Sequence, residues 1–129
     1  MKKLIASLFV SSLFLTGCST GASSASVTNL GASEFLTEAQ AQGVVLIDVR
    51  TPGEFSEGHI VDALNIDVQS GSFQSEIAAL DKNATYALYC RSGNRSGTAA
   101  DIMADAGFTK ILNAKVGFAD LVNAGANPA

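Results

Sequence analysis

Residues 84–96 read ATYALYCRSGNRS, and this stretch decides the fold. Its first six residues form a short apolar run between polar segments, which is typical of a buried strand in a parallel sheet. A polar loop follows Cys90, and a helix is predicted over residues 96–106, ending at Gly107. This strand–loop–helix turn places Cys90 at the carboxyl end of its strand, where open α/β sheets bind their ligands.

The rest of the chain alternates in the same way between short apolar runs and helical patterns. Further strands are predicted over residues 27–30, 44–47, 64–66 and 110–112. Further helices are predicted over residues 32–42, 51–57, 72–80 and 118–124, the second of them opening with the capping-box sequence TPGE. The alternation predicts an α/β fold, a single domain with a central, mostly parallel sheet and helices on both faces.

Cys90 has the surroundings of an activated nucleophile. The turn after it points backbone N–H groups inward at the amino end of a helix dipole, and Arg91 and Arg95 add two positive charges. An ordinary cysteine pKa near 8.5 leaves only about 3% thiolate at pH 7, and such surroundings lower the pKa enough to favour the thiolate. The alternative is a small buried hydrophobe at a strand end.

The amino-terminal residues carry the pattern of an export signal. Lys2 and Lys3 precede an apolar run over residues 4–15, which is too short for a settled transmembrane helix. The run closes with the sequence LTGC at residues 15–18, which resembles the lipobox of bacterial lipoproteins, in which Cys18 becomes the lipidated first residue. An ordinary secretory signal is the alternative. We expect a signal peptide over residues 1–17 and a lipidated Cys18 with a flexible tether over residues 18–26.

This organisation leaves residues 27–129 for the folded domain and predicts a lipid-anchored protein of the cell envelope. Ser19, rather than aspartate, follows Cys18, which in Gram-negative cells favours the outer membrane, with the domain facing the periplasm. Two cysteines in an exported chain also suggest a disulfide. A thioether at Cys18 would prevent that bridge and leave Cys90 as the free thiol.

The charge balance excludes one class of partner. Eight Lys and Arg residues face twelve Asp and Glu, a formal net charge of −4 at pH 7. Without Lys2 and Lys3 the balance is six against twelve, a net charge near −6. No basic run is present, so nucleic-acid binding has no electrostatic basis. With one histidine, His59, and no cluster of ligand residues, the sequence shows no pattern of a metal site.

Two motifs resemble those of the rhodanese sulfurtransferases. CRSGNRS at residues 90–96 resembles the family's active-site loop, and LIDVRTPGEF (46–55) with EGHIVDALNI (57–66) resembles its other signature stretch. Order and spacing agree from about Val27 to the end of the chain. The resemblance therefore implies a rhodanese-like domain and a cofactor-free transfer of sulfur, in which the Cys90 thiolate takes sulfur from a donor such as thiosulfate and passes it to a thiol or cyanide.

The resemblance also implies roles for individual residues. Cys90 would carry the persulfide, with Arg91 at the mouth, Arg95 closing the loop and Asp48 and Arg50 as supporting residues that are mainly architectural. The remaining loop residues would cradle the sulfur: Ser92, Gly93, Asn94 and Ser96. His59 is expected to belong to the scaffold rather than to act as a general base. The sequence assigns no oligomeric state and no physiological donor or acceptor.

The sequence departs from the family near its end. The usual pattern has two glycines and a tryptophan, whereas this chain has Val116-Gly117-Phe118, which puts donor specificity in doubt more than the fold. Two other functions remain open. One is a persulfide carrier or sulfide-binding module with little turnover. The other is a phosphatase or arsenate reductase, although those relatives have one more residue between the cysteine and the arginine.

Overall fold

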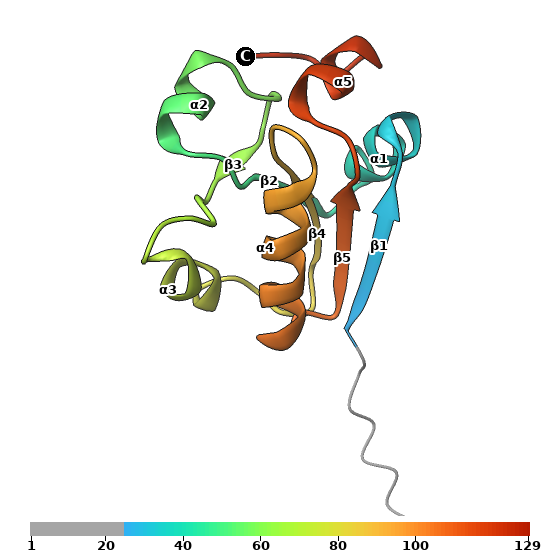
Figure 1. Cartoon of the computed structure of the whole chain (residues 1–129). Coiled ribbons are helices and arrows are strands. Elements are labelled where there is room, and N and C mark those ends of the chain that lie inside the picture. The colour runs from blue at the N-terminus through green and yellow to red at the C-terminus, as the bar shows by residue number, and fades with distance from the viewer. Residues whose placement is uncertain (1–24) are drawn as a thin grey trace, which may run out of the picture.

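The computed structural model describes residues 25–129 (Figure 1). The predicted signal peptide, the lipidated Cys18 and most of the tether lie outside these residues. Within residues 25–129, no helix has the length and the apolar run that crossing a membrane requires.

Five strands form one sheet in which every neighbouring pair is parallel. Their order across the sheet is β1 (Ser26–Leu30), β5 (Lys110–Ala114), β4 (Thr85–Tyr89), β2 (Val44–Asp48) and β3 (Leu64–Asn65). The predicted α/β class with a parallel sheet is confirmed. β1 begins at Ser26, one residue earlier than the sequence suggested, because the Ser26 amide donates to the Thr109 carbonyl at 2.9 Å.

Four helices connect the strands and a fifth follows the last one: α1 (Ala32–Ala39), α2 (Pro52–Glu57), α3 (Phe73–Ala78), α4 (Asn94–Asp105) and α5 (Phe118–Asn123). The capping box at the start of α2 is present, with the Glu54 amide donating to Thr51 Oγ1 and the Thr51 amide donating to the Glu54 carboxylate. α4 begins at Asn94, two residues earlier than predicted. Gly93, at φ 93°, turns the chain straight from the loop into the helix.

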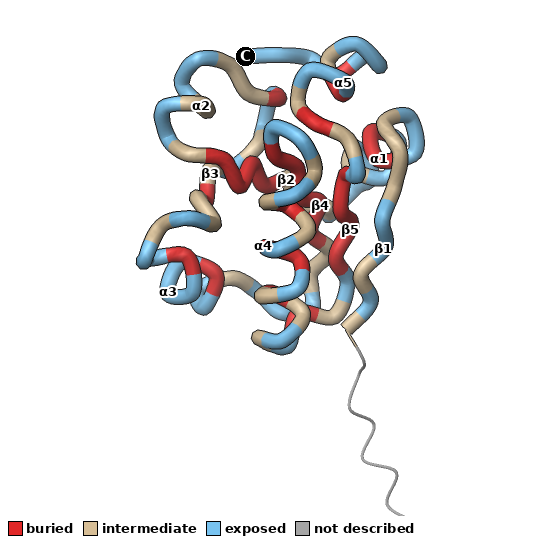
Figure 2. Tube along the Cα trace, in the orientation of Figure 1, coloured by how far each residue is buried: buried red, intermediate tan, exposed pale blue. Residues whose placement is uncertain are grey.

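The sheet is buried on both faces, which is why its central strands are almost continuously apolar (Figure 2). Along β4, Tyr86 and Leu88 pack in the cluster under α3 and α4, and Cys90, just beyond the strand, continues on that side. Ala87 and Tyr89 pack in the second cluster, under α1 and α5. Each fully buried side chain of this size contributes roughly 1.5–3 kcal/mol, so the two clusters fix β4 firmly between two layers of helices.

The two ends of the sheet have different roles. Asp48, the last residue of β2, lies opposite Tyr89, the last residue of β4, so the segments that follow both strands emerge side by side. The amino end of β1 lies at the opposite end of the strands, at the bottom of Figure 1, whereas the turn into α4 lies towards the top. The fold thus places Cys90 at the carboxyl ends of the strands and the start of β1 at their amino ends.

Candidate active site

Cys90 is the free cysteine of the described part of the chain, and its side chain is fully buried. The Gly93 amide donates a hydrogen bond to Cys90 Sγ at 3.0 Å, and the thiol donates to Ser96 Oγ at 3.5 Å. The Ser96 hydroxyl also lies 3.2 Å from the Gly93 carbonyl and 3.4 Å from the Ala114 carbonyl. The sulfur therefore lies beneath a closed turn in which the Gly93 amide points at it, and the Ser96 hydroxyl lies within reach to donate to it once the thiol is ionised.

These contacts set the ionisation of the thiol. Burial by itself raises the pKa of Cys90, because a thiolate loses hydration there. Hydrogen bonds from the Ser96 hydroxyl and from the amides of Ser96, Ser92 and Gly93 outweigh that effect and lower the pKa. The turn thus favours the thiolate, which is the reactive form of cysteine.

Two glycines allow the β5–α5 segment to pack against the Cys90 turn. A Cβ on Gly93 would lie 2.5 Å from the Lys115 carbonyl oxygen, and a Cβ on Gly117 would overlap the Arg91 carbonyl. The Phe118 amide donates to the Cys90 carbonyl at 2.9 Å. The turn is therefore supported by backbone from a segment more than twenty residues further along the chain.

Arg95 does not point freely towards a ligand. Its guanidinium makes a bidentate ion pair with the Glu54 carboxylate, at 2.7 and 2.8 Å. Glu54 also caps α2, and the hydrogen bond from Arg95 is the largest influence in lowering the pKa of Glu54 to about 2. The pair links the first turn of α4 to the first turn of α2, so it holds the Cys90 turn from its outer side.

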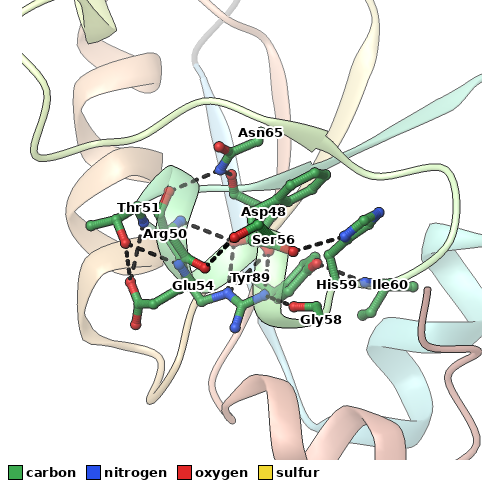
Figure 3. A network of polar contacts seen from close by, with 12 residues as sticks. Asp48, Arg50, Thr51, Glu54, Ser56, Gly58, His59, Ile60, Asn65 and Tyr89 are labelled. Atoms are coloured by element: carbon green, nitrogen blue, oxygen red, sulfur yellow. Dashed lines mark hydrogen bonds and ion pairs between the residues drawn. The ribbon is translucent and has the colours of Figure 1, made fainter.

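Asp48 and Arg50 form a second ion pair that is almost wholly buried (Figure 3). The Arg50 guanidinium donates to both oxygens of Asp48 and, at 2.6 Å, to the Gly58 carbonyl. It also lies 4.4 Å from the centre of the Phe118 ring. Through Nε and Nη2, Arg50 links the end of β2 to the Gly58 carbonyl just after α2.

The sequence model of the rhodanese-like domain family matches residues 31–124, most of the chain. The chain belongs to the rhodanese-like domain family. The match over residues 31–124 agrees with the resemblance of the CRSGNRS loop and with the parallel five-stranded sheet described above.

The chain is similar in sequence to proteins named as sulfurtransferases. The chain is 37% identical over 68 residues to the thiosulfate sulfurtransferase PspE of Escherichia coli, an alignment that covers 53% of this chain and 65% of that protein. It is 33% identical over 87 residues to a sulfurtransferase of Allochromatium vinosum, covering 66% of this chain and 79% of that protein. The crystal structure of a rhodanese-related protein from Thermoplasma volcanium has the same fold, with a TM-score of 0.68 and 24% identity over 79% of this chain and 97% of that one.

The remaining predicted residues of the rhodanese loop lie on its outer side. Arg91, Ser92 and Asn94 are exposed, and no ion pair within residues 25–129 involves Arg91. His59 lies in the scaffold, where its Nδ1 is 2.9 Å from the Phe55 carbonyl and its ring stacks on Phe55 at 3.7 Å. The structure therefore brings Cys90, Gly93, Ser96 and the Arg95 ion pair together, and it keeps His59 in the α2 segment.

Sequence reasoning did not identify Glu54 as a partner of the loop. Its place in the capping box was recognised, but the separation of 41 positions between Glu54 and Arg95 hid their contact. The altered stretch Val116-Gly117-Phe118 keeps the one glycine that must touch the loop, while the Phe118 ring stacks near Tyr89, with the ring centres 6.1 Å apart. The departure from the family pattern thus preserves the support of the Cys90 turn.

Within residues 25–129, Cys90 belongs neither to a possible metal centre nor to the hollow beside α1 and β2. Among the described residues, no group of three or more His, Cys, Asp or Glu side chains could hold a metal ion. A hollow of about 600 Å³ lies beside α1 and β2 and is lined by residues such as Leu36, Leu46 and Leu64, away from Cys90. The candidate site is therefore defined by the chemistry of the turn rather than by a large cavity.

Proposed function

We propose that the chain is a sulfurtransferase that moves a sulfane sulfur from a small donor such as thiosulfate to a thiophilic acceptor through a persulfide on Cys90. The observation that carries the proposal is the set of hydrogen-bond donors around Cys90 Sγ, which lowers the pKa of the thiol in spite of its burial. The names of the relatives, thiosulfate sulfurtransferase and sulfurtransferase, support the same class of reaction.

In the first half-reaction the Cys90 thiolate attacks the outer sulfur of thiosulfate. A sulfur–sulfur bond forms to Cys90, the sulfur–sulfur bond of thiosulfate breaks, and its electron pair leaves with sulfite. The products are a Cys90 persulfide anion and a sulfite dianion, so charge is conserved without an added proton, oxidant or metal.

In the second half-reaction an acceptor attacks the outer sulfur of the persulfide. With cyanide the product is thiocyanate, and the Cys90 thiolate is regenerated. Between the two half-reactions the negative charge lies on the outer sulfur of the persulfide, among the inward amides of the turn. Preorganised N–H donors stabilise such a charge at little reorganisation cost. The same donors thus serve the thiolate in one step and the persulfide in the next.

Intact-mass analysis tests the nucleophile directly. Thiosulfate should add one sulfur atom to a soluble form beginning near residue 25, and cyanide should remove it. Cys90→Ser should stay unmodified and inactive, because Cys90 is the cysteine of residues 25–129. Sulfur transfer by Cys90→Ser would contradict the assignment of Cys90 as the nucleophile.

The length of the loop separates this proposal from phosphatase or arsenate reductase chemistry. Four residues lie between Cys90 and Arg95, so the turn closes tightly around a single sulfur. Inserting one glycine after Asn94 should lower the rate of sulfur transfer about 100- to 1,000-fold, as expected when a preorganised donor is lost. Paired assays with thiosulfate plus cyanide and with an aryl phosphate test this. Aryl phosphate hydrolysis by the wild type without sulfur transfer would overturn the interpretation.

The complete burial of Cys90 favours a second candidate, a persulfide carrier that loads readily and turns over slowly. Rapid-mixing experiments distinguish the two functions. An enzyme with thiosulfate and cyanide should give steady turnover well beyond one sulfur per chain, whereas a carrier should give one rapid equivalent and then stop until a protein acceptor is supplied.

We propose further that the chain is anchored through a lipid on Cys18, on the strength of the LTGC sequence at residues 15–18. β1 starts at the amino ends of the parallel strands and Cys90 follows the carboxyl end of β4, so an anchor before β1 would leave the active-site end accessible (Figure 1). Cys18→Ser should release the protein from membranes or block processing of the signal. A wild-type chain that fractionates with soluble proteins and carries no acyl mass would contradict the anchor. Membrane attachment through a lipidated cysteine is stable because each buried methylene contributes about 0.8 kcal/mol.

A further inference from the structure

Lys115 borders the Cys90 turn although it lies 25 residues further along the chain. It directly follows β5, its amide donates to the Leu30 carbonyl at 2.9 Å, and its own carbonyl packs against Gly93. Its backbone is therefore held between β1 and the residue whose amide contacts Cys90 Sγ. Its side chain is exposed.

Lys115 is one of the few positive charges near the turn that no carboxylate of the described residues neutralises. Of the arginines near Cys90, Arg50 is paired with Asp48 and Arg95 with Glu54, so each pair has a net charge of zero. Within residues 25–129 no ion pair involves Arg91 or Lys115. These two are the exposed, uncompensated cations of the segments that form the turn and its support.

An anionic donor meets an electrostatic barrier without such cations. It must approach a thiolate in a domain where six basic residues face twelve acidic ones. Asp120 adds to this barrier, because it accepts a hydrogen bond from the Gly117 amide and Gly117 packs against the Arg91 carbonyl. A lysine on a flexible stem at the rim offsets this charge without occupying the amides of the turn.

We propose that Lys115 is a specificity-determining residue, which together with Arg91 forms a cationic rim that selects small dianionic sulfur donors. This inference rests on the proposed sulfurtransferase function. A unit charge roughly 6 Å from a dianion favours its binding about tenfold in water at low ionic strength, and favours a monoanion about threefold. Screening at 0.15 M salt reduces the advantage for the dianion to about threefold.

Steady-state kinetics of Lys115→Ala test the rim. With thiosulfate at low ionic strength, kcat/KM should fall about five- to tenfold through a higher KM, with kcat nearly unchanged. With an arenethiosulfonate, which carries one negative charge, the fall should be about two- to threefold. Lys115→Glu changes the charge by two units rather than one, so the fold-loss in kcat/KM for each donor should be roughly the square of that in Lys115→Ala. All these losses should become smaller as salt is added.

Lys110→Ala is the matched control, because Lys110 is an exposed lysine at the other end of the same strand. It should leave kcat/KM for both donors unchanged. An unaltered kcat/KM in Lys115→Ala, equal losses for the two donors, or equal losses in the two lysine variants would each overturn the proposal. Failure of the sulfurtransferase function itself would be visible separately, as a wild-type chain that gains no sulfur from thiosulfate.

Discussion

Removal of the Ser96 hydroxyl should weaken the nucleophile while leaving the fold in place. In Ser96→Ala, Cys90 Sγ loses the side-chain hydrogen bond that contributes most to lowering its pKa. A hydrogen bond to a charged group contributes about 1.5–3 kcal/mol, and the 3.5 Å separation places this one at the lower end. About 1.4 kcal/mol corresponds to a tenfold smaller fraction of thiolate at any pH below the pKa.

When Cys90 is protonated, the single Ser96 hydroxyl hydrogen is shared with the nearby Gly93 carbonyl, so its loss should also lower the free energy of unfolding by about 1 kcal/mol. The rate of alkylation by iodoacetamide as a function of pH measures the thiolate directly. The profile of Ser96→Ala should move about one pH unit upward, and sulfur transfer at neutral pH should fall about tenfold.

Ser92→Ala is the matched control for this prediction. Ser92 lies in the same turn, but its hydroxyl is exposed and makes no hydrogen bond within the described residues, while its amide would remain in place. Its alkylation profile should match that of the wild type. If Ser96→Ala folds normally and its thiol titrates at the wild-type pH, the assignment of the hydroxyl as a stabiliser of the thiolate is wrong.

Two further predictions concern the support of the turn. Gly117→Ala should reduce sulfur transfer and lower the free energy of unfolding by about 1–3 kcal/mol, because the new Cβ collides with the Arg91 carbonyl, whereas Gly31→Ala, at an open position, should do neither in kinetic and urea-unfolding assays. Glu54→Gln should destabilise the chain by about 2 kcal/mol at pH 7, since the folded-state pKa of Glu54 is about 2, below its ordinary 4.5. The lowered pKa stabilises the fold above about pH 4.5, and this contribution disappears as the pH falls towards 2, so the two unfolding free energies should converge there. A difference that stays constant between pH 7 and pH 3 would mean that the charge pair with Arg95 is not its source.

The sequence alone determined the order of the elements and the position of the nucleophile. β4 is apolar because both faces of a parallel sheet are covered, and that run ends at Cys90. The glycine and polar residues that follow cannot extend the strand, and they lead into α4. Local signals of this kind act over a few residues, which is why the strand–loop–helix turn was correctly predicted together with the capping box at Thr51.

Only the tertiary structure decided which charges surround the nucleophile and which are neutralised. Arg95 looks like a free loop cation in the sequence, but Glu54, 41 residues earlier, neutralises it once β2 and β4 lie side by side. Lys115 looks like an ordinary surface lysine, yet the pairing of β1 with β5 brings it against Gly93. Contacts between residues distant in sequence depend on the register of the strands, and no local pattern encodes them, so the electrostatic character of the site emerged only when the sheet was assembled.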